Sequence, residues 1–264
     1  MTPPATVEAG GVALAYEDRG DGPPVVLVHG TATARTVWRE TTEALPSSRT
    51  IAYDRRAYGD SGAPEPYGGT TVGEQADDLA ELIEALDAAP ATVCGHELGA
   101  LACLDLIARH PRLVERAVLI EPPMLWLVGD GTDAVGELRE AVARGAREKG
   151  AAGAVRAYLE ATGGPEIERL LGPERMEAAQ ESPRAFAADL AAAASWAGGR
   201  KELGALETPV TLVTGTRSAP VRREATEALA AMIPGARVEV VDSGHFVHLE
   251  RPAEVAATIR GGGV

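Results

Sequence analysis

Short runs of β-branched and other apolar residues recur along the first half of the chain and again near its end. They predict strands over residues 12–16, 25–29, 50–53, 92–95, 117–120, 210–214 and 237–241. Between them, longer segments carry apolar residues three and four positions apart, a spacing typical of helices that pack on one face. These helices are expected over residues 72–86, 98–109, 222–233 and 253–259. The alternation predicts an α/β fold, with helices on both faces of a mostly parallel, twisted sheet.

The strand pattern stops between residues 123 and 206. Alanine-rich helical segments take its place, with breaks at Gly129-Asp130-Gly131, Gly163-Gly164-Pro165 and Gly172-Pro173. We expect this stretch to form a helical cap inserted into a core of residues 1–122 and 207–264. The length of 264 residues is enough for one large α/β domain with such an insertion.

The segment Gly95-His96-Glu97-Leu98-Gly99 joins a predicted strand to a predicted helix. Its glycines, two residues either side of Glu97, permit a sharp, strained turn that raises the central side chain at the edge of the sheet. The segment has the form of a nucleophile elbow, with a carboxylate where ester hydrolysis requires serine. Alone the pattern is weak, because a solvated glutamate at a helix start is stabilised by the helix dipole in any case.

Three further segments support a catalytic role for this turn. His29-Gly30-Thr31 ends a predicted strand, and its backbone amides could face the elbow. A charged turn over residues 54–62 follows the next strand. Ser243-Gly244-His245 follows the last strand, where a base belongs in the chain order nucleophile, acid, histidine.

With these motifs the whole chain resembles the α/β-hydrolase superfamily, and its elbow most resembles that of epoxide hydrolases and haloalkane dehalogenases. In those enzymes an elbow aspartate attacks an alkyl carbon, and a histidine-activated water then hydrolyses the ester. Here Glu97 stands in place of the aspartate, and its extra methylene moves the carboxyl by ~1.5 Å, a shift that matters for attack geometry. Ordinary esterase or lipase chemistry is disfavoured, because a carboxylate nucleophile would form an anhydride from an acyl substrate.

The resemblance also bears on the acid that orients His245. In most members it follows the strand after the cap, where this chain reads Thr216-Arg217-Ser218 and has no carboxylate. Other members carry it at the end of the strand before the cap, which assigns the role to Glu121. An ion pair of Glu121 with a nearby arginine is the simpler structural alternative, and Asp242 is a weaker candidate for the acid.

The expected site therefore has three parts. Glu97, His245 and Glu121 are the catalytic residues, and the backbone N–H groups of Thr31 and Leu98 receive the developing negative charge. Contacts with the substrate are expected from His29, Gly30, His96, Trp126, Tyr158 and Trp196. The three cap aromatics in this set would serve equally well to fill the core of the cap. The cap holds only one tyrosine, Tyr158, whereas epoxide hydrolases typically offer two, which weakens the assignment to epoxides.

Three functions stay open at this point. The first is cofactor-independent, epoxide-hydrolase-like hydrolysis or ring opening of a small organic substrate by Glu97. The second is acid/base chemistry by Glu97 and His245, as in a lyase, isomerase or cyclase of specialised metabolism. The third is a ligand binder in which the substituted elbow has ended catalysis.

Composition narrows the choice of partners and cofactors. A net charge of −14 disfavours nucleic acid and anionic membranes as partners. The chain has neither a run of about 18 apolar residues nor a basic, apolar leader, so we expect a cytoplasmic protein. Cys94 and Cys103 lie in apolar contexts without metal-ligand spacing, and we expect no metal or organic cofactor. A small molecule is the expected partner, and a homodimer is compatible with the sequence.

Overall fold

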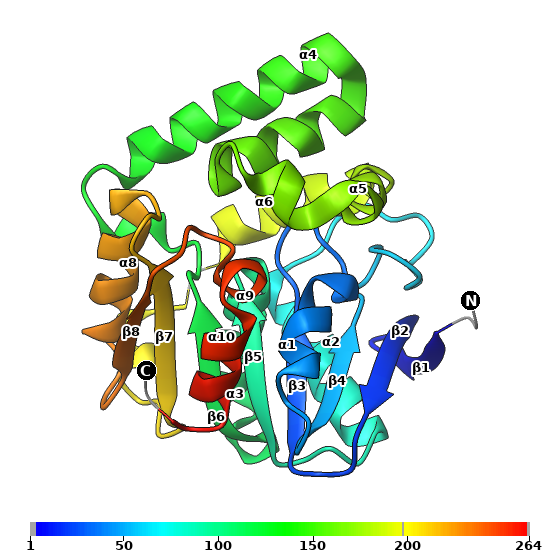
Figure 1. The fold of residues 1–264 in the computed structure, drawn as a ribbon, viewed down its shortest axis with the longest axis vertical. Coiled ribbons are helices and arrows are strands. Elements are labelled where there is room, and N and C mark those ends of the chain that lie inside the picture. The colour runs from blue at the N-terminus through cyan, green and yellow to red at the C-terminus, as the bar shows by residue number, and fades with distance from the viewer. Residues whose placement is uncertain (1–3, 197, 263–264) are drawn as a thin grey trace.

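An eight-stranded sheet forms the centre of the protein (Figure 1), in a computed structural model that describes residues 4–196 and 198–262. The strands are β1 (Ala5–Ala9), β2 (Val12–Arg19), β3 (Pro24–Val28), β4 (Arg49–Tyr53), β5 (Ala91–His96), β6 (Val114–Ile120), β7 (Val210–Gly215) and β8 (Arg237–Val241). Their order is β1-β2-β4-β3-β5-β6-β7-β8. Pairing is antiparallel from β1 through β2 to β4 and parallel from there to β8. The mostly parallel sheet is confirmed, and β1 is an edge strand that the sequence pattern missed.

Helices cover both faces of this sheet because consecutive strand residues point to opposite sides. In β3, Val26 and Val28 belong to one apolar cluster while Val25 and Leu27 belong to the other. The first cluster is covered by α2 (Val72–Ala85), α3 (Leu98–Arg109) and α8 (Pro220–Ala230). The second is covered by α9 (Val247–Glu250) and α10 (Pro252–Ile259), and the short helix α1 (Arg39–Glu43) packs against both.

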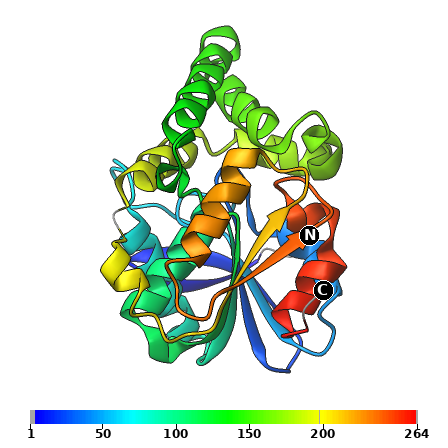
Figure 2. The same ribbon diagram turned by 90° about the vertical axis from the view of Figure 1, so that its left-hand side faces the viewer.

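A helical insertion between β6 and β7 stands over one edge of the sheet (Figures 1 and 2). It contains α4 (Gly131–Gly163), α5 (Ile167–Gln180), α6 (Pro183–Ser195) and α7 (Arg200–Leu203), and the 3-10 turn η3 (Leu125–Leu127) precedes it. The expected breaks near Gly163 and Gly172 are present, the second as a kink within α5. A further kink at Gly150, where φ is 66°, was not predicted. Within the described part of the chain, none of the helices is long and apolar enough to cross a membrane.

Candidate active site

Glu97 lies at the tip of a strained turn between β5 and α3. Its backbone adopts φ 50° and ψ −115°, a left-handed conformation that costs a non-glycine residue on the order of 1–3 kcal/mol. The glycines on either side allow the turn: a Cβ at Gly95 would meet the carbonyl oxygen of Gly99 at 2.4 Å, and one at Gly99 would meet that of Val28 at 2.4 Å. The Glu97 N–H donates to the carbonyl of Ile120 at 2.9 Å, which ties the turn to β6.

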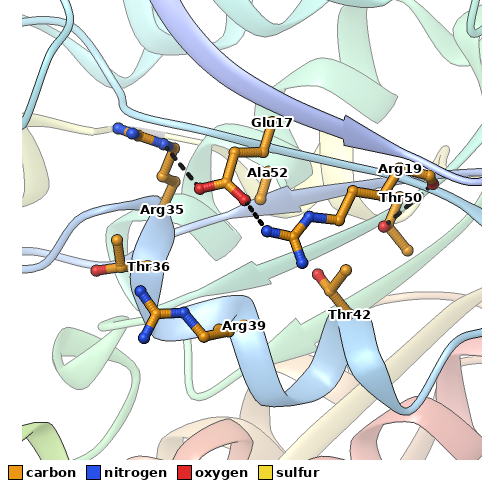
Figure 3. A pocket seen from close by; sticks show the side chains of 8 residues that line it. All are labelled: Glu17, Arg19, Arg35, Thr36, Arg39, Thr42, Thr50 and Ala52. Carbon is orange, nitrogen blue, oxygen red and sulfur yellow. Dashed lines mark hydrogen bonds and ion pairs between the residues drawn. The ribbon is translucent and has the colours of Figure 1, made fainter. Parts of the chain in front are cut away.

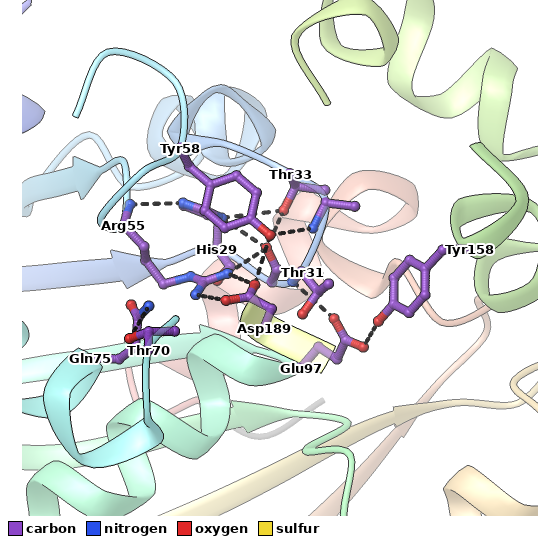
Figure 4. Close-up of polar contacts among 12 residues, drawn as sticks. His29, Thr31, Thr33, Arg55, Tyr58, Thr70, Gln75, Glu97, Tyr158 and Asp189 are labelled. Carbon is purple, nitrogen blue, oxygen red and sulfur yellow. Dashed lines mark hydrogen bonds and ion pairs between the residues drawn. The ribbon is translucent and has the colours of Figure 1, made fainter. Parts of the chain in front are cut away.

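The Glu97 carboxylate bridges the core and the cap (Figure 4). Its Oε2 accepts a hydrogen bond from the backbone N–H of Thr31 at 2.9 Å. Its Oε1 accepts one from the hydroxyl of Tyr158, which α4 brings down from the cap. Both side chains are buried, with Glu97 4% and Tyr158 2% exposed. The Thr31 amide is thus placed at the elbow as the sequence predicts, and Leu98 begins α3 directly after Glu97, so its N–H has no intrahelical acceptor.

His245 and Glu121 form a buried pair at the ends of neighbouring strands. The His245 Nδ1 lies 2.6 Å from Oε2 of Glu121, so Nδ1–H donates and Nε2 is left as the basic nitrogen. Glu121 is held in turn by the Thr214 hydroxyl at 2.7 Å and the Gly215 N–H at 3.0 Å, both on Oε1. Burial raises the pKa of Glu121, but the hydrogen bond and charge of His245 outweigh it and lower that pKa to about 2. Glu121 therefore stays ionised at neutral pH and can stabilise an imidazolium.

The other candidate acid has a different environment. Asp242 is exposed and pairs with Arg217 at 2.5 Å and with Arg251 at 3.6 Å. Among the described residues, Glu121 has no arginine within ion-pair distance. Of the two candidate acids, Glu121 and Asp242, it is Glu121 that lies beside His245.

A buried ionic network fixes the loop that carries Thr31. The Arg55 guanidinium donates to the carbonyls of His29 at 2.9 Å and Gly30 at 3.1 Å. The same guanidinium forms a two-pronged pair with Asp189 of α6, at 2.6 and 3.1 Å. The Tyr58 hydroxyl also donates to Asp189, at 2.8 Å. A cap carboxylate therefore holds the groups that position the loop beside Glu97 (Figure 4).

His29 and His96 are buried and make their contacts with other parts of the protein. The Nε2 of His29 accepts from the Arg55 N–H at 2.9 Å, and its Nδ1 lies 2.9 Å from the Gly30 carbonyl, so both nitrogens bind backbone. Burial, with the nearby Arg55 charge, keeps the pKa of His29 well below its usual value. His96 packs among aromatic rings, 4.6 Å from those of both His245 and His248. Contact of either residue with a substrate therefore stays a prediction.

Gly30 has a steric role in this region. A Cβ at this position would lie 2.7 Å from Nδ1 of His96 and 3.2 Å from Cβ of Glu97. The absent side chain lets the loop approach the elbow closely enough for the Thr31 amide to reach the carboxylate.

The two cap tryptophans are not brought to Glu97. Trp126 is 48% exposed on η3. The indole N–H of Trp196 donates to Asp105 of α3 at 3.0 Å, and its ring packs against the apolar cluster on that face. Their expected roles as substrate contacts stay predictions, since residue type alone does not show which way a side chain of the cap points. Of the three cap aromatics named above, Tyr158 is the one whose side chain hydrogen-bonds to Glu97 in the described structure.

A separate hollow lies between β2, β4 and the segment that leads into α1 (Figure 3). Its charged side chains pair with one another: Glu17 lies between Arg19 at 2.6 Å and Arg35 at 3.5 Å. None of its lining residues belongs to the Glu97, His245 and Glu121 group. This hollow is therefore separate from the candidate catalytic residues.

Sequence reasoning missed Arg55, Tyr58 and Asp189. The first two lie in the charged turn over residues 54–62, which the sequence singled out without assigning its residues. Asp189 carried a usable signal, because it stands three residues from both Phe186 and Ala192 on the buried face of α6. A carboxylate on an apolar helix face needs a partner, and here that partner is Arg55.

Curated proteins of related sequence match part of the chain. Among curated relatives, the putative non-heme bromoperoxidase BpoC of Mycobacterium tuberculosis (strain ATCC 25618 / H37Rv) is 38% identical over 114 residues, 41% of this chain and 42% of the relative. The putative carbamate hydrolase RutD of Agrobacterium fabrum is 36% identical over 101 residues, 38% of each chain. The chain spans less than half of the length of these curated relatives.

Solved structures match over nearly the whole chain. A thermophilic esterase from Thermogutta terrifontis has a TM-score of 0.78 at 27% identity, covering 98% of this chain and 96% of that one. An enol-lactonase from Burkholderia xenovorans LB400 has a TM-score of 0.80 at 23% identity, over 97% and 98%, which is a likeness of fold alone. Residues 25–258 match the model of the alpha/beta hydrolase family. With its sheet order, its elbow and its cap between β6 and β7, the chain belongs to the alpha/beta hydrolase family.

Proposed function

We propose that this protein is a hydrolase in which Glu97 attacks an alkyl carbon of a small, ring-strained or otherwise activated organic substrate. The observation that carries the proposal is the state of the Glu97 carboxylate, which has one oxygen on the Thr31 amide and the other on the Tyr158 hydroxyl. The first oxygen, Oε2, would become the carbonyl oxygen of an ester on Glu97, and the Thr31 N–H already donates a hydrogen bond to it. The second contacts the Tyr158 hydroxyl, so a proton donor lies close to the point of attack, where a leaving ring oxygen needs one.

The first step uses Glu97 and Tyr158. Oε1 of Glu97 forms a bond to a ring carbon of an epoxide-like substrate, the bond from that carbon to the ring oxygen breaks, and the ring oxygen takes the Tyr158 proton. Burial, and then the nearby Glu97 charge, raises the pKa of Tyr158 well above its usual value, so the phenol is protonated at neutral pH. The enzyme then carries an alkyl ester on Glu97, with Oε2 on the Thr31 amide.

The second step uses His245 and Glu121. Water gives a proton to Nε2 of His245 and attacks the ester carbonyl carbon of Glu97. The resulting oxyanion is stabilised by the N–H groups of Thr31 and Leu98, and the imidazolium by Glu121 at 2.6 Å. Collapse breaks the bond from the carbonyl carbon to the alkyl oxygen, and the proton of the added hydroxyl passes to that leaving oxygen. The products are the diol and the Glu97 carboxylate, and the His245 proton returns to Tyr158 through water. The sum is epoxide plus water giving diol, with no cofactor taking part.

Family membership, one relative named as a putative carbamate hydrolase and one solved structure named as an esterase support hydrolysis as the reaction class. The Glu97–Tyr158 contact also serves a second candidate, a proton-transferring lyase, isomerase or cyclase, since a carboxylate and a phenol can act as base and acid. The two candidates differ in one respect, because acid/base chemistry leaves no covalent adduct on Glu97.

A trapping experiment separates them. In His245→Gln, incubation with a panel of epoxides, haloalkanes, lactones and esters should build up an alkyl ester, because the second step has lost its base. Intact-protein mass should rise by one opened substrate, and peptide mapping should place the addition on Glu97. The matched control is the Glu97→Gln/His245→Gln double variant, which should stay unmodified. Wild-type turnover without any adduct in His245→Gln would favour the acid/base candidate.

A further inference from the structure

Arg222 is a buried cation at the edge of the site that the reaction above leaves without a role. It lies in the first turn of α8, which begins just after the carboxyl end of β7. Because β5, β6 and β7 are parallel neighbours, this is the same edge of the sheet that carries Glu97 after β5 and Glu121 after β6. α8 also contacts η3, the turn that leads into the cap. Arg222 thus lies where core, cap and elbow meet.

The guanidinium of Arg222 is not paired with an anion in the described part of the chain. The residue is 8% exposed, and its buried Nη1 has no hydrogen-bond partner among the described residues. Throughout residues 4–196 and 198–262, no carboxylate comes within ion-pair distance of it, whereas the buried Arg55 and Arg56 are both paired. An unpaired buried charge costs several kcal/mol in a folded protein, so such a group is retained where something else pairs with it.

The nearest acidic groups are already occupied. Both oxygens of Glu121 are bound, by Thr214, Gly215 and His245. Both oxygens of Glu97 are bound as well, by the Thr31 amide and Tyr158. The positive charge of Arg222 nevertheless contributes to the low pKa of Glu121 and opposes the rise in the pKa of Tyr158 that burial causes, so it acts within the site. The residues that the structure describes therefore leave Arg222 free to pair with an anion from outside the chain.

We propose that Arg222 binds a carboxylate of the substrate, and therefore that the substrates of Glu97 are small carboxylic acids. A planar guanidinium matches the two oxygens of a carboxylate, and one arginine balances a single negative charge. The pairing also offsets the repulsion that Glu97 and Glu121 would exert on an anionic substrate. The proposal that the substrates are small carboxylic acids rests on the proposed function. Binding of a carboxylate by Arg222 can be tested without turnover.

Binding of an unreactive acid is the first test. Cyclopropanecarboxylate and cyclopropanecarboxamide have the same shape, and neither offers a carbon that Glu97 can attack readily. By calorimetry at low salt, wild-type protein should bind the acid at least about tenfold more tightly than the amide, as a charge-assisted pair predicts. Arg222→Met should lose that preference and Arg222→Lys should keep part of it. Arg223→Met removes the same charge one residue further along α8 and should keep the preference.

Turnover is the second test. Glycidate should be a better substrate than glycidamide in wild type, and Arg222→Met should raise KM for glycidate at least about tenfold while changing KM for glycidamide little. Equal binding of acid and amide by wild type, or an unchanged preference in Arg222→Met that remains folded by circular dichroism, would overturn the proposal. If the acid binds through Arg222 but no epoxide is opened, the role of Arg222 stands and the proposed hydrolysis fails.

Discussion

Replacing Glu97 by glutamine should reduce kcat/KM by on the order of 10⁴-fold or more for any substrate that the wild-type enzyme opens. The reason is that a neutral amide, unlike a carboxylate, does not attack an alkyl carbon at neutral pH. Glutamine keeps the volume of the side chain, and its amide oxygen can still accept from the Thr31 N–H, so the fold should be preserved. The measurement is the initial rate of purified wild type and variant, with thermal unfolding as the test of folding.

Glu97→Asp is the matched control for this substitution. It keeps the carboxylate but draws it back from Thr31 and Tyr158, and a misplacement of about 1 Å can cost on the order of 10²-fold in rate. We therefore expect Glu97→Asp to lie between wild type and Glu97→Gln. A Glu97→Gln variant with most of the wild-type rate would show that the carboxylate is not the attacking group.

Replacing Asp189 by asparagine should destabilise the protein by about 3–5 kcal/mol, because it leaves the fully buried Arg55 guanidinium without its counter-charge. The same change should lower activity, since Arg55 and Tyr58 then lose the anchor that holds the loop around Thr31. Urea unfolding at neutral pH gives the stability, and initial rates measured well below the unfolding midpoint give the activity.

An exposed ion pair is the control for Asp189→Asn. Glu160 pairs with Arg156 on the surface of the same cap at 3.0 Å, and Glu160→Gln should cost no more than about 1 kcal/mol. In an Asp189→Leu/Arg55→Met variant, part of the lost stability should return, because apolar groups of similar size need no counter-charge. Equal stabilities of Asp189→Asn and Glu160→Gln would show that the buried pair does not lock the cap to the loop.

Much of the fold could be predicted because strands that are buried on both faces of a sheet are apolar along their whole length. The parallel strands read as short apolar runs, and the elbow reads as glycines at two fixed positions around Glu97. Glu121 could be assigned because the usual position for the acid, Thr216 to Ser218, holds no carboxylate. These features depend on residues close together in the chain or on a fixed order of motifs.

The rest depends on contacts between segments far apart in the chain. Arg55 and Asp189 are separated by 134 residues, and nothing local to either predicts that they meet. The orientation of Trp196 toward Asp105 follows from the rotation of α6 against α3, which alanine-rich sequence does not specify. Arg222 becomes a candidate for substrate binding only once its burial, and its lack of an ion pair among the described residues, are known.

Covalent attack by Glu97 can be detected by following oxygen-18 through one turnover in labelled water, with enzyme in excess over substrate. If Glu97 attacks, the oxygen added to the product comes from its carboxylate, so the product stays unlabelled and the peptide that contains Glu97 gains the label. If water attacks the substrate directly, the product carries the label and Glu97 carries none, which would contradict the mechanism.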